Sequence, residues 1–433
     1  MLTTLGILMV VTFIILIMTK RVSTLVALIT IPIIYALIGG FGSQISEMMM
    51  DGVTQVAPTA VMLTFAILYF GIMIDAGLFD PLVSFILKTV KGDPLKIVIG
   101  TAILIAFVAL DGDGTSLIMI VVSAMLPLYR QLKMNPLILS GLIILGIGIL
   151  NLVPWGGPTS RAVAALKVDM NQVFLPLIPV LLVGLLWFFF TAYVLGKKEQ
   201  KRLGTIDLSQ LDVIQSTPDE HAVALEKSLL KRPRLVWVNL IVTSILMVVL
   251  LTGMLPLPIL FMIATTIALI FNYPRIKDQK TVISNHASNV LIVVSLIFAA
   301  GIFTGILSGT KMADAMATTF VSFVPDSLAS YLTLAVAVLS GPFTFFLSND
   351  AFYFGILPVL AKTGISYGID PVEIARASLL GQPIHVLSPL LGAVYLLTGM
   401  VGVEFNDHLR FILKWACATS VVMILAALLF GVI

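Results

Sequence analysis

Long apolar segments recur along the whole chain and are separated by short polar ones. Ten of these segments are close to the roughly 20 residues that an α-helix needs to cross a bilayer. They are residues 2–19, 22–40, 55–77, 137–152 and 173–195, followed by 236–252, 256–271, 288–308, 372–401 and 408–431. The pattern predicts an all-α polytopic membrane protein with about ten transmembrane helices.

Two further apolar regions, 97–128 and 332–362, are interrupted halfway by polar residues. The interruptions are Asp111–Ser116, with the sequence DGDGTS, and Leu347–Phe352, with the sequence LSNDAF. We expect each half of these regions to form a helix of about 10 to 15 residues, which is too short to cross ~30 Å of hydrocarbon. Each region is therefore predicted to be a re-entrant hairpin with its polar tip in the middle of the membrane.

The same order of features occurs twice along the chain. In each half a span, a hairpin and a second interrupted span follow one another; the second interruptions are Leu152–Arg161 and Gly381–Pro389. The first repeat is therefore assigned to 1–196 and the second to 235–433. Five crossings per repeat is an odd number, so the second repeat is predicted to be inverted. Inverted repeats with interrupted helices are typical of secondary transporters.

The composition agrees with this prediction and excludes several other classes. Of the 433 residues, 59% are apolar and only 11% are charged, which does not suit a soluble globular protein. The net charge of +3 is too small to indicate nucleic-acid binding. The single cysteine, Cys417, excludes a disulfide framework and a cysteine-rich metal site.

Charged residues are concentrated between Lys197 and Arg234, and we interpret 197–234 as a solvated linker between the repeats. Short cytoplasmic loops collect Lys and Arg. Nearly all basic residues fall on one side when both termini are placed outside and each hairpin makes no net crossing. The linker is then cytoplasmic, whereas Arg161 and Arg376 remain within the membrane. These assignments describe a multi-pass protein of the plasma membrane.

The tip of the first hairpin carries acids and hydroxyls on a glycine-rich turn. Asp111 and Asp113 provide carboxylates, and Thr115 and Ser116 lie beside a helix start. Oxygen ligands of this kind suit hard cations such as Mg2+ or Ca2+, or a proton. The structural alternative is a simple helix cap. A charge in mid-membrane costs about 2.5–3.5 kcal/mol, which favours a functional role.

The tip of the second hairpin offers Ser348, Asn349 and Asp350. We predict that Ser348 and Asn349 contact the substrate and that Asp350 ligates a cation or carries a proton. The alternative is again that these side chains only cap a helix.

The second interruption of the first repeat contains an arginine after helix-breaking residues. A planar guanidinium suits bidentate recognition of a carboxylate. Arg161 is therefore predicted to bind an anionic substrate, and the alternative is a standing ion pair with Asp111 or Asp113. The predicted substrate-binding residues of this segment are Gly156, Gly157, Pro158, Thr159, Ser160 and Arg161.

The corresponding interruption of the second repeat carries Gln382, His385 and Ser388, which we also predict to line the substrate site. His385 could shuttle protons near neutral pH. The alternative is a hydrogen-bonded packing histidine among apolar neighbours.

Two other charges fall within predicted spans. Asp75 either pairs with a basic group or joins a proton path. Arg376 lies three residues after Glu373, a spacing that favours a local helical ion pair.

These segments resemble the citrate–divalent metal:proton symporter family, which belongs to the ion transporter superfamily. The resemblance runs nearly from end to end of the chain. It is carried by Ile17–Arg21, Asp111–Thr115, Asn151–Ala162, Leu347–Lys362 and Gly381–Leu390.

The resemblance implies uptake of citrate as a complex with a divalent cation such as Mg2+ or Ca2+, driven by cotransported protons. It further implies a homodimer of elevator type, in which a moving domain holds both hairpins, and no permanently bound cofactor.

A channel is disfavoured because occluded interruptions suit transfer of one substrate at a time. Two further alternatives are a sodium-coupled di- or tricarboxylate carrier that takes the free anion and an intramembrane aspartyl protease that uses Asp75 and Asp113.

Overall fold

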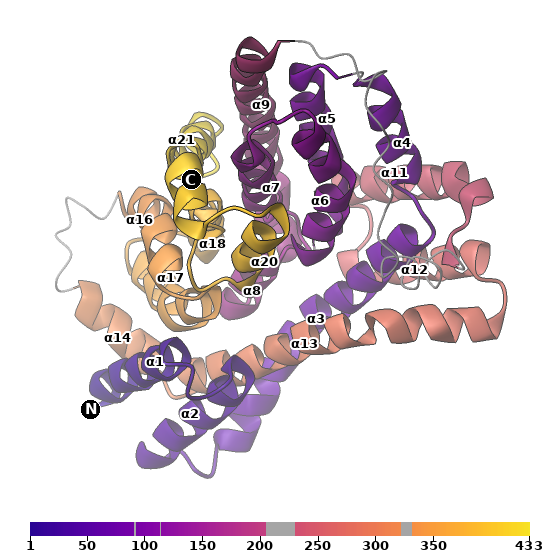
Figure 1. The fold of residues 1–433 in the computed structure, drawn as a ribbon. Helices are drawn as coiled ribbons and strands as arrows, with labels where there is room; N and C mark the ends of the chain where they lie inside the picture. Colours follow the sequence, from indigo (N-terminus) through magenta and orange to yellow (C-terminus); the bar gives the residue numbers. More distant parts are fainter. Residues whose placement is uncertain (91, 113, 205–229, 322–330) are drawn as a thin grey trace.

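The computed structural model is helical throughout the residues that it describes, which are 1–90, 92–112, 114–204, 230–321 and 331–433 (Figure 1). None of these residues is in a β-strand. The first half contains α1 (Leu2–Met18), α2 (Thr24–Ile38), α3 (Ile45–Asp75), α4 (Asp80–Thr89), α5 (Pro94–Val108), η1 (Ala109–Asp111), α6 (Gly114–Gln131), α7 (Pro136–Leu150), α8 (Gly157–Leu166) and α9 (Met170–Leu203).

The second half repeats a similar order of elements. It contains η3 (Pro233–Leu235), α11 (Val236–Thr252), α12 (Leu257–Asn272), α13 (Ile276–Gly309), α14 (Met312–Val321), α16 (Leu332–Phe346), η4 (Ala351–Ile356), α17 (Leu357–Ser366), α18 (Pro371–Leu379), α19 (Gln382–His385), α20 (Gly392–Val401) and α21 (Phe405–Leu429). In both halves a long helix (α3 or α13) is followed by a short one, by an interrupted helix pair, by a second interruption and by another long helix.

Six helical segments of the described residues are long and apolar enough to cross a membrane. They are Ile45–Asp75, Pro94–Asp111, Met170–Leu203, Pro233–Thr252, Ile276–Gly309 and Phe405–Leu429. The all-α, multi-pass architecture predicted from the sequence is therefore confirmed. Several other predicted spans correspond to apolar helices of 10–17 residues. The predicted linker is helical up to Leu203, and its central part, 205–229, lies outside the described residues.

The first interrupted region turns where the sequence predicts, but its arms are longer than expected. Asp93 caps α5 by accepting a hydrogen bond from the Leu95 amide, and Pro94 suits the first helical turn. Because η1 continues α5, the first arm spans 18 residues, Pro94–Asp111, instead of 10 to 15. α5 packs against α6, so the chain turns back on itself at the interruption.

The long helices α3 and α13 make the most extensive contact between any two elements of the described chain, and they run side by side across the lower part of Figure 1. Glycines allow this close approach. A Cβ atom on Gly52 would lie 1.9 Å from the carbonyl oxygen of Gly301. α3 also contacts η1 and α8, and α13 contacts α8 and η4. The α3–α13 pair therefore supports the interrupted segments of both halves.

The long helices α9 and α21 contact each other, and α7 packs against both. Arg376 of α18 fixes part of this arrangement, because its Nη2 donates to the Gln172 carbonyl at 2.8 Å and its Nη1 donates to the Val432 carbonyl at 3.2 Å. The expected ion pair between Arg376 and Glu373 is not among the salt bridges of the described residues. Two carbonyls, both remote in sequence, take the guanidinium instead.

We expect Gly52→Ala to destabilise the protein, because the added methyl group meets the backbone of α13 and no side chain can move aside. Overpacking of this kind costs about 1–3 kcal/mol. Thermal unfolding in detergent should show a lower Tm for Gly52→Ala. Gly399→Ala is the control, because a Cβ at Gly399 meets no atom within 4 Å. Equal Tm values for the two variants would contradict the proposed close packing.

Candidate functional site

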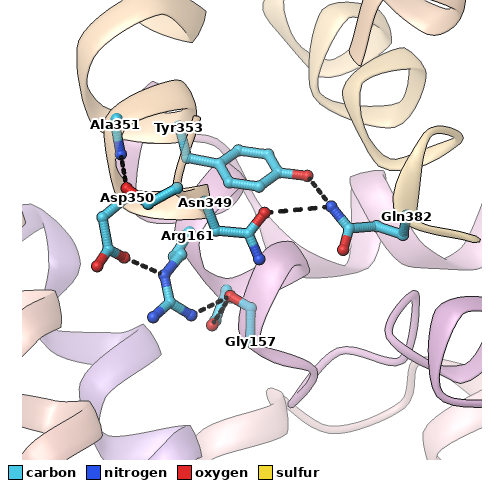
Figure 2. A network of polar contacts seen from close by, with 9 residues as sticks. Gly157, Arg161, Asn349, Asp350, Ala351, Tyr353 and Gln382 are labelled. Atoms are coloured by element: carbon cyan, nitrogen blue, oxygen red, sulfur yellow. Dashed lines mark hydrogen bonds and ion pairs between the residues drawn. The ribbon is translucent and has the colours of Figure 1, made fainter. Parts of the chain in front are cut away.

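The charged centre of the candidate site is an ion pair between the two halves of the chain (Figure 2). Arg161, on α8, approaches Asp350, which directly precedes η4, with 2.6 Å between Nε and Oδ1. The Nη1 atom of Arg161 also donates to the Gly157 carbonyl at 3.0 Å. The side chains are 22% and 15% exposed. The structure thus pairs Arg161 with Asp350, whereas the ion-pair alternative from the sequence named Asp111 or Asp113.

An amide network lies beside this ion pair, with Gln382 at its centre (Figure 2). Its Nε2 donates to the Tyr353 hydroxyl at 3.0 Å and is 3.5 Å from Asn349 Oδ1. Its Oε1 accepts from Asn151 Nδ2 at 3.4 Å. The Tyr353 hydroxyl donates to the Ser378 carbonyl at 3.2 Å. The network joins the second interruptions of both halves to the tip of the second helix pair.

Two members of this network, Asn151 and Tyr353, were not among the residues predicted from the sequence. Both lie within segments that the sequence singles out, Asn151–Ala162 and Leu347–Lys362. Tyr353 follows Asn349 by four residues, a spacing that places two side chains on one helix face. That spacing could have predicted Tyr353 from the sequence. For Asn151, the sequence gives only its position next to the interruption.

The tip of the first helix pair contributes Asp111, which is buried at the end of η1. Gly112 follows with φ of 76°, a conformation that glycine adopts readily and that ends the helix there. Asp111 and Asn151 both line a cavity of about 10 Å3, close to the volume that one water requires. Asp113 lies outside the described residues.

The two hydroxyls predicted at this tip begin α6. Thr115 is exposed and Ser116 is half-buried. The structure therefore places both residues in the first turn of a helix, beside the interruption.

Side chains from each second interruption bind the last carbonyls of the helix that leads into the first interruption of the same half. Trp155 Nε1 donates to the Leu110 carbonyl at 2.8 Å. His385 Nδ1 is 2.7 Å from the Thr344 carbonyl, and Ser388 Oγ donates to the Phe345 carbonyl at 2.7 Å. These carbonyls belong to helix ends, where no intrahelical donor remains. Because a carbonyl can only accept, Nδ1 carries the hydrogen in His385.

Three other predicted site residues use their hydroxyls locally. Thr159 donates to the Asn151 carbonyl at 3.0 Å, Ser160 donates to the Gly157 carbonyl at 2.9 Å, and Ser348 accepts from the Ala351 amide at 3.1 Å. These bonds fix the turns on either side of the Arg161–Asp350 pair.

The start of α8 is equally constrained. Gly156 is its N-cap, and a Cβ there would lie 2.3 Å from the Asn151 carbonyl oxygen. Pro158 occupies the first turn of the helix. The glycine allows the chain to turn tightly at this point, which brings the beginning of α8 against the end of α7.

An aromatic cluster encloses the interruption between α7 and α8. The Trp155 ring lies 5.1 Å from that of Phe70 on α3 and 5.2 Å from that of Phe261 on α12, measured between centroids. Aromatic pairs at this separation add about 0.5–1.5 kcal/mol beyond area burial. All three rings are buried, so the cluster covers this side of the interruption.

The donor set suits an anionic oxygen ligand. Arg161 Nη2 makes no hydrogen bond with any described residue, so it can donate to a carboxylate. Within the described part of the chain, no group of three His, Cys, Asp or Glu residues could hold a metal ion.

The sequence matches the citrate transporter family over residues 13–381. A citrate transporter of Bacillus subtilis strain 168 is 57% identical over 433 residues, with 100% of both chains covered. A Mg(2+)/citrate complex secondary transporter of the same organism is 54% identical, with 100% of this chain and 99% of that protein covered. This chain belongs to the citrate transporter family, which confirms the resemblance seen in its motifs.

Two solved transporter structures share the fold at 14% sequence identity. The Alcanivorax borkumensis YdaH transporter matches with a TM-score of 0.54 over 89% of this chain and 86% of its own. Neisseria gonorrhoeae MtrF, described as illuminating a class of antimetabolite efflux pumps, matches with a TM-score of 0.58 over 90% and 84%. The family and the relatives are transporters and not enzymes. This confirms the prediction that the protein is a transporter, and it excludes the intramembrane protease alternative.

We expect Trp155→Phe to lower the Tm, because the Leu110 carbonyl loses its donor while a smaller aromatic ring remains at this position. Leaving a buried acceptor unsatisfied costs about 1–3 kcal/mol. Trp187→Phe is a matched control, because the buried Nε1 of Trp187 has no hydrogen-bond partner among the described residues. The capping role of Trp155 is wrong if both variants unfold at the temperature of the unmodified protein.

Proposed function

We propose that the protein is a secondary active transporter that imports citrate complexed with a divalent metal ion, coupled to protons. The observation that carries this proposal is the Arg161–Asp350 pair, in which one guanidinium joins the two halves of the chain at the candidate site. The relative described as a Mg(2+)/citrate complex secondary transporter supports a metal-bound substrate.

In this mechanism citrate enters with its metal already bound, so the net charge of the complex is close to −1 and less charge must be desolvated. The free carboxylate of the complex replaces Asp350 on Arg161, where Nη2 is already available. Helix N-termini at α8 and η4 add N–H donors. Asp350, once released, joins Asp111 and Asp113 as oxygen groups that face the metal or carry protons.

The remaining predicted site residues lie next to the proposed ligands or hold the helix ends that carry them. Thr115 and Ser116 lie beside Asp111, and Asn349 and Gln382 belong to the amide network next to Arg161. His385 and Ser388 act by holding the end of α16, which precedes the Asp350 turn. Divalent metal selectivity between Mg2+ and Ca2+ then depends on how many oxygens the assembled tips present.

For the architecture we propose two inverted repeats, 1–196 and 235–433, with about ten transmembrane helices and two re-entrant hairpins. The repeated element order on either side of 197–234 supports this division. The hairpins move with the substrate against a fixed scaffold in an elevator-type cycle, and two protomers form a homodimer. Both termini lie outside the plasma membrane and the linker lies in the cytoplasm, as the distribution of Lys and Arg predicts.

A sodium-coupled carrier of free di- or tricarboxylate remains the second candidate. Serine, asparagine and backbone carbonyls are suitable sodium ligands, and Ser348 and Asn349 lie at an interrupted helix. The buried Asp111 favours protons or a divalent metal instead.

Metal removal separates these two candidates. We expect uptake of labelled citrate into proteoliposomes to rise with added Mg2+ or Ca2+, and to fall to background with a chelator, because free citrate carries too much charge for this site. A proton gradient directed into the proteoliposomes should stimulate the uptake, and a sodium gradient should not. Undiminished uptake in a chelator would overturn the metal-complex proposal.

Arg161→Gln should reduce uptake by about a hundredfold, because the substrate loses a charge-assisted, bidentate partner worth roughly 2–3 kcal/mol. Asp350→Asn should bind metal–citrate more readily, because Arg161 no longer has a competing carboxylate, but should transport it poorly. Binding can be measured by calorimetry and transport by labelled uptake. Arg410→Gln, an exposed arginine of α21, is the control and should transport normally. Normal uptake by Arg161→Gln would refute the site assignment.

A further inference from the structure

A second acidic–basic pair joins α3 to α13. His286 Nε2 lies 2.9 Å from Asp75 Oδ2, and each side chain is 17% exposed. The two residues are 211 positions apart in the sequence. Asp75 is the last residue of α3, and His286 lies in the first third of α13. The pair therefore fastens one end of the most extensive helix contact in the described chain.

The imidazole is positioned by direct contact with the α3 backbone. A Cβ on Gly71 would lie 2.6 Å from both Cε1 and Nδ1 of His286. Gly71 precedes Asp75 by four residues, so both lie on the same face of α3. The glycine leaves room for the ring, and the carboxylate then meets its Nε2 atom. A larger residue at position 71 would displace the ring from Asp75.

The other charges near this pair already have partners of opposite sign. Arg232 is 4.0 Å from Asp278, and its guanidinium lies 4.8 Å from the Tyr273 ring centroid. Lys231 pairs with Asp80 at 2.6 Å. Burial, reinforced by Asp75 and Asp278, raises the pKa of the Tyr273 phenol, so Tyr273 stays neutral. The charge of this junction therefore depends on whether the imidazole of His286 is protonated.

The backbone around the pair is tied down as well. The Arg232 amide donates to the Ala76 carbonyl at 3.0 Å, and its Nε donates to the Asn272 carbonyl at 2.9 Å. The Tyr273 hydroxyl donates to the Leu230 carbonyl at 2.9 Å. The ends of α3 and α12 are therefore held together independently of His286.

We propose that Asp75 and His286 form a proton-binding site through which the pH gradient acts on transport. With Asp75 ionised, the Nε2 hydrogen of neutral His286 is donated to Oδ2, and an incoming proton binds at Nδ1. The pair then changes from a net charge of −1 to zero. The binding of this proton is the only chemical change in the step.

Protonation at this position can reach the substrate site through the two long helices. α3 contacts η1 and α8, and α13 contacts α8 and η4, which are the elements that carry or adjoin Asp111, Arg161 and Asp350. A full ion pair would hold the end of α3 against α13 more strongly than the same carboxylate bonded to an uncharged imidazole. This inference rests on the proton coupling of the proposed function, but it assigns the proton to a different place from the hairpin tips.

Transport assays with and without a proton gradient test the inference. Proteoliposomes containing the full chain would be used to compare Mg2+–citrate uptake driven by an inward pH gradient with counterflow exchange at equal pH. We expect His286→Gln and Asp75→Asn to lose the stimulation by the gradient and to retain counterflow within about twofold, since exchange needs no net proton movement. The amide side chains can still hydrogen-bond across α3 and α13.

The matched control is Thr243→Val. It removes another hydrogen bond of α3, the 2.9 Å contact between Tyr69 and Thr243 of α11, without removing a titratable group. This variant should keep the full response to the gradient.

Two results would overturn the inference. One is a pH-gradient response of His286→Gln equal to that of the unmodified protein. The other is a parallel loss of counterflow and gradient-driven uptake in a folded His286→Gln protein, which would mark the pair as structural. A lack of gradient response in the unmodified protein would instead defeat the proton coupling in the proposed function.

Discussion

Every carbonyl and amide that a helix break exposes inside a bilayer needs a hydrogen-bond partner from the protein or from water. The protein meets this requirement by pairing its interruptions. Trp155 donates a hydrogen bond to the Leu110 carbonyl at one helix end. At the other, His385 and Ser388 donate to the carbonyls of Thr344 and Phe345. The two halves use different residues for the same task. Side chains that look like substrate ligands in the sequence thereby hold the helix ends around Arg161 and Asp350.

The charges at the centre of the site are balanced within the protein before any substrate arrives. A lone guanidinium in this environment would be costly, and Asp350 compensates it across the two halves of the chain. In the mechanism that we propose, substrate binding exchanges one carboxylate for another, so the cost of desolvating Arg161 does not recur in each cycle. The same ion pair also keeps α8 and η4 together when the site holds no substrate.

The sequence predicted the helical class, the family and the positions of the polar interruptions, because Gly, Pro, Asp and Ser mark helix ends locally. It underestimated the first arm because the Asp93 cap and the 3-10 extension to Asp111 depend on backbone geometry. It also could not assign a partner to Arg161 or Asp75. Those partners, Asp350 and His286, are 189 and 211 residues away and are chosen by how α8, α3 and α13 pack.

The indole of Trp155 has a practical consequence for following the protein at work. It lies on the interruption between α7 and α8, yet its ring contacts Phe70 of α3 and Phe261 of α12. Any sliding of the interrupted segments past those two helices must change the polarity around the indole. The fluorescence of this tryptophan, isolated by replacing the other three, would therefore serve as a built-in optical reporter of the transport cycle.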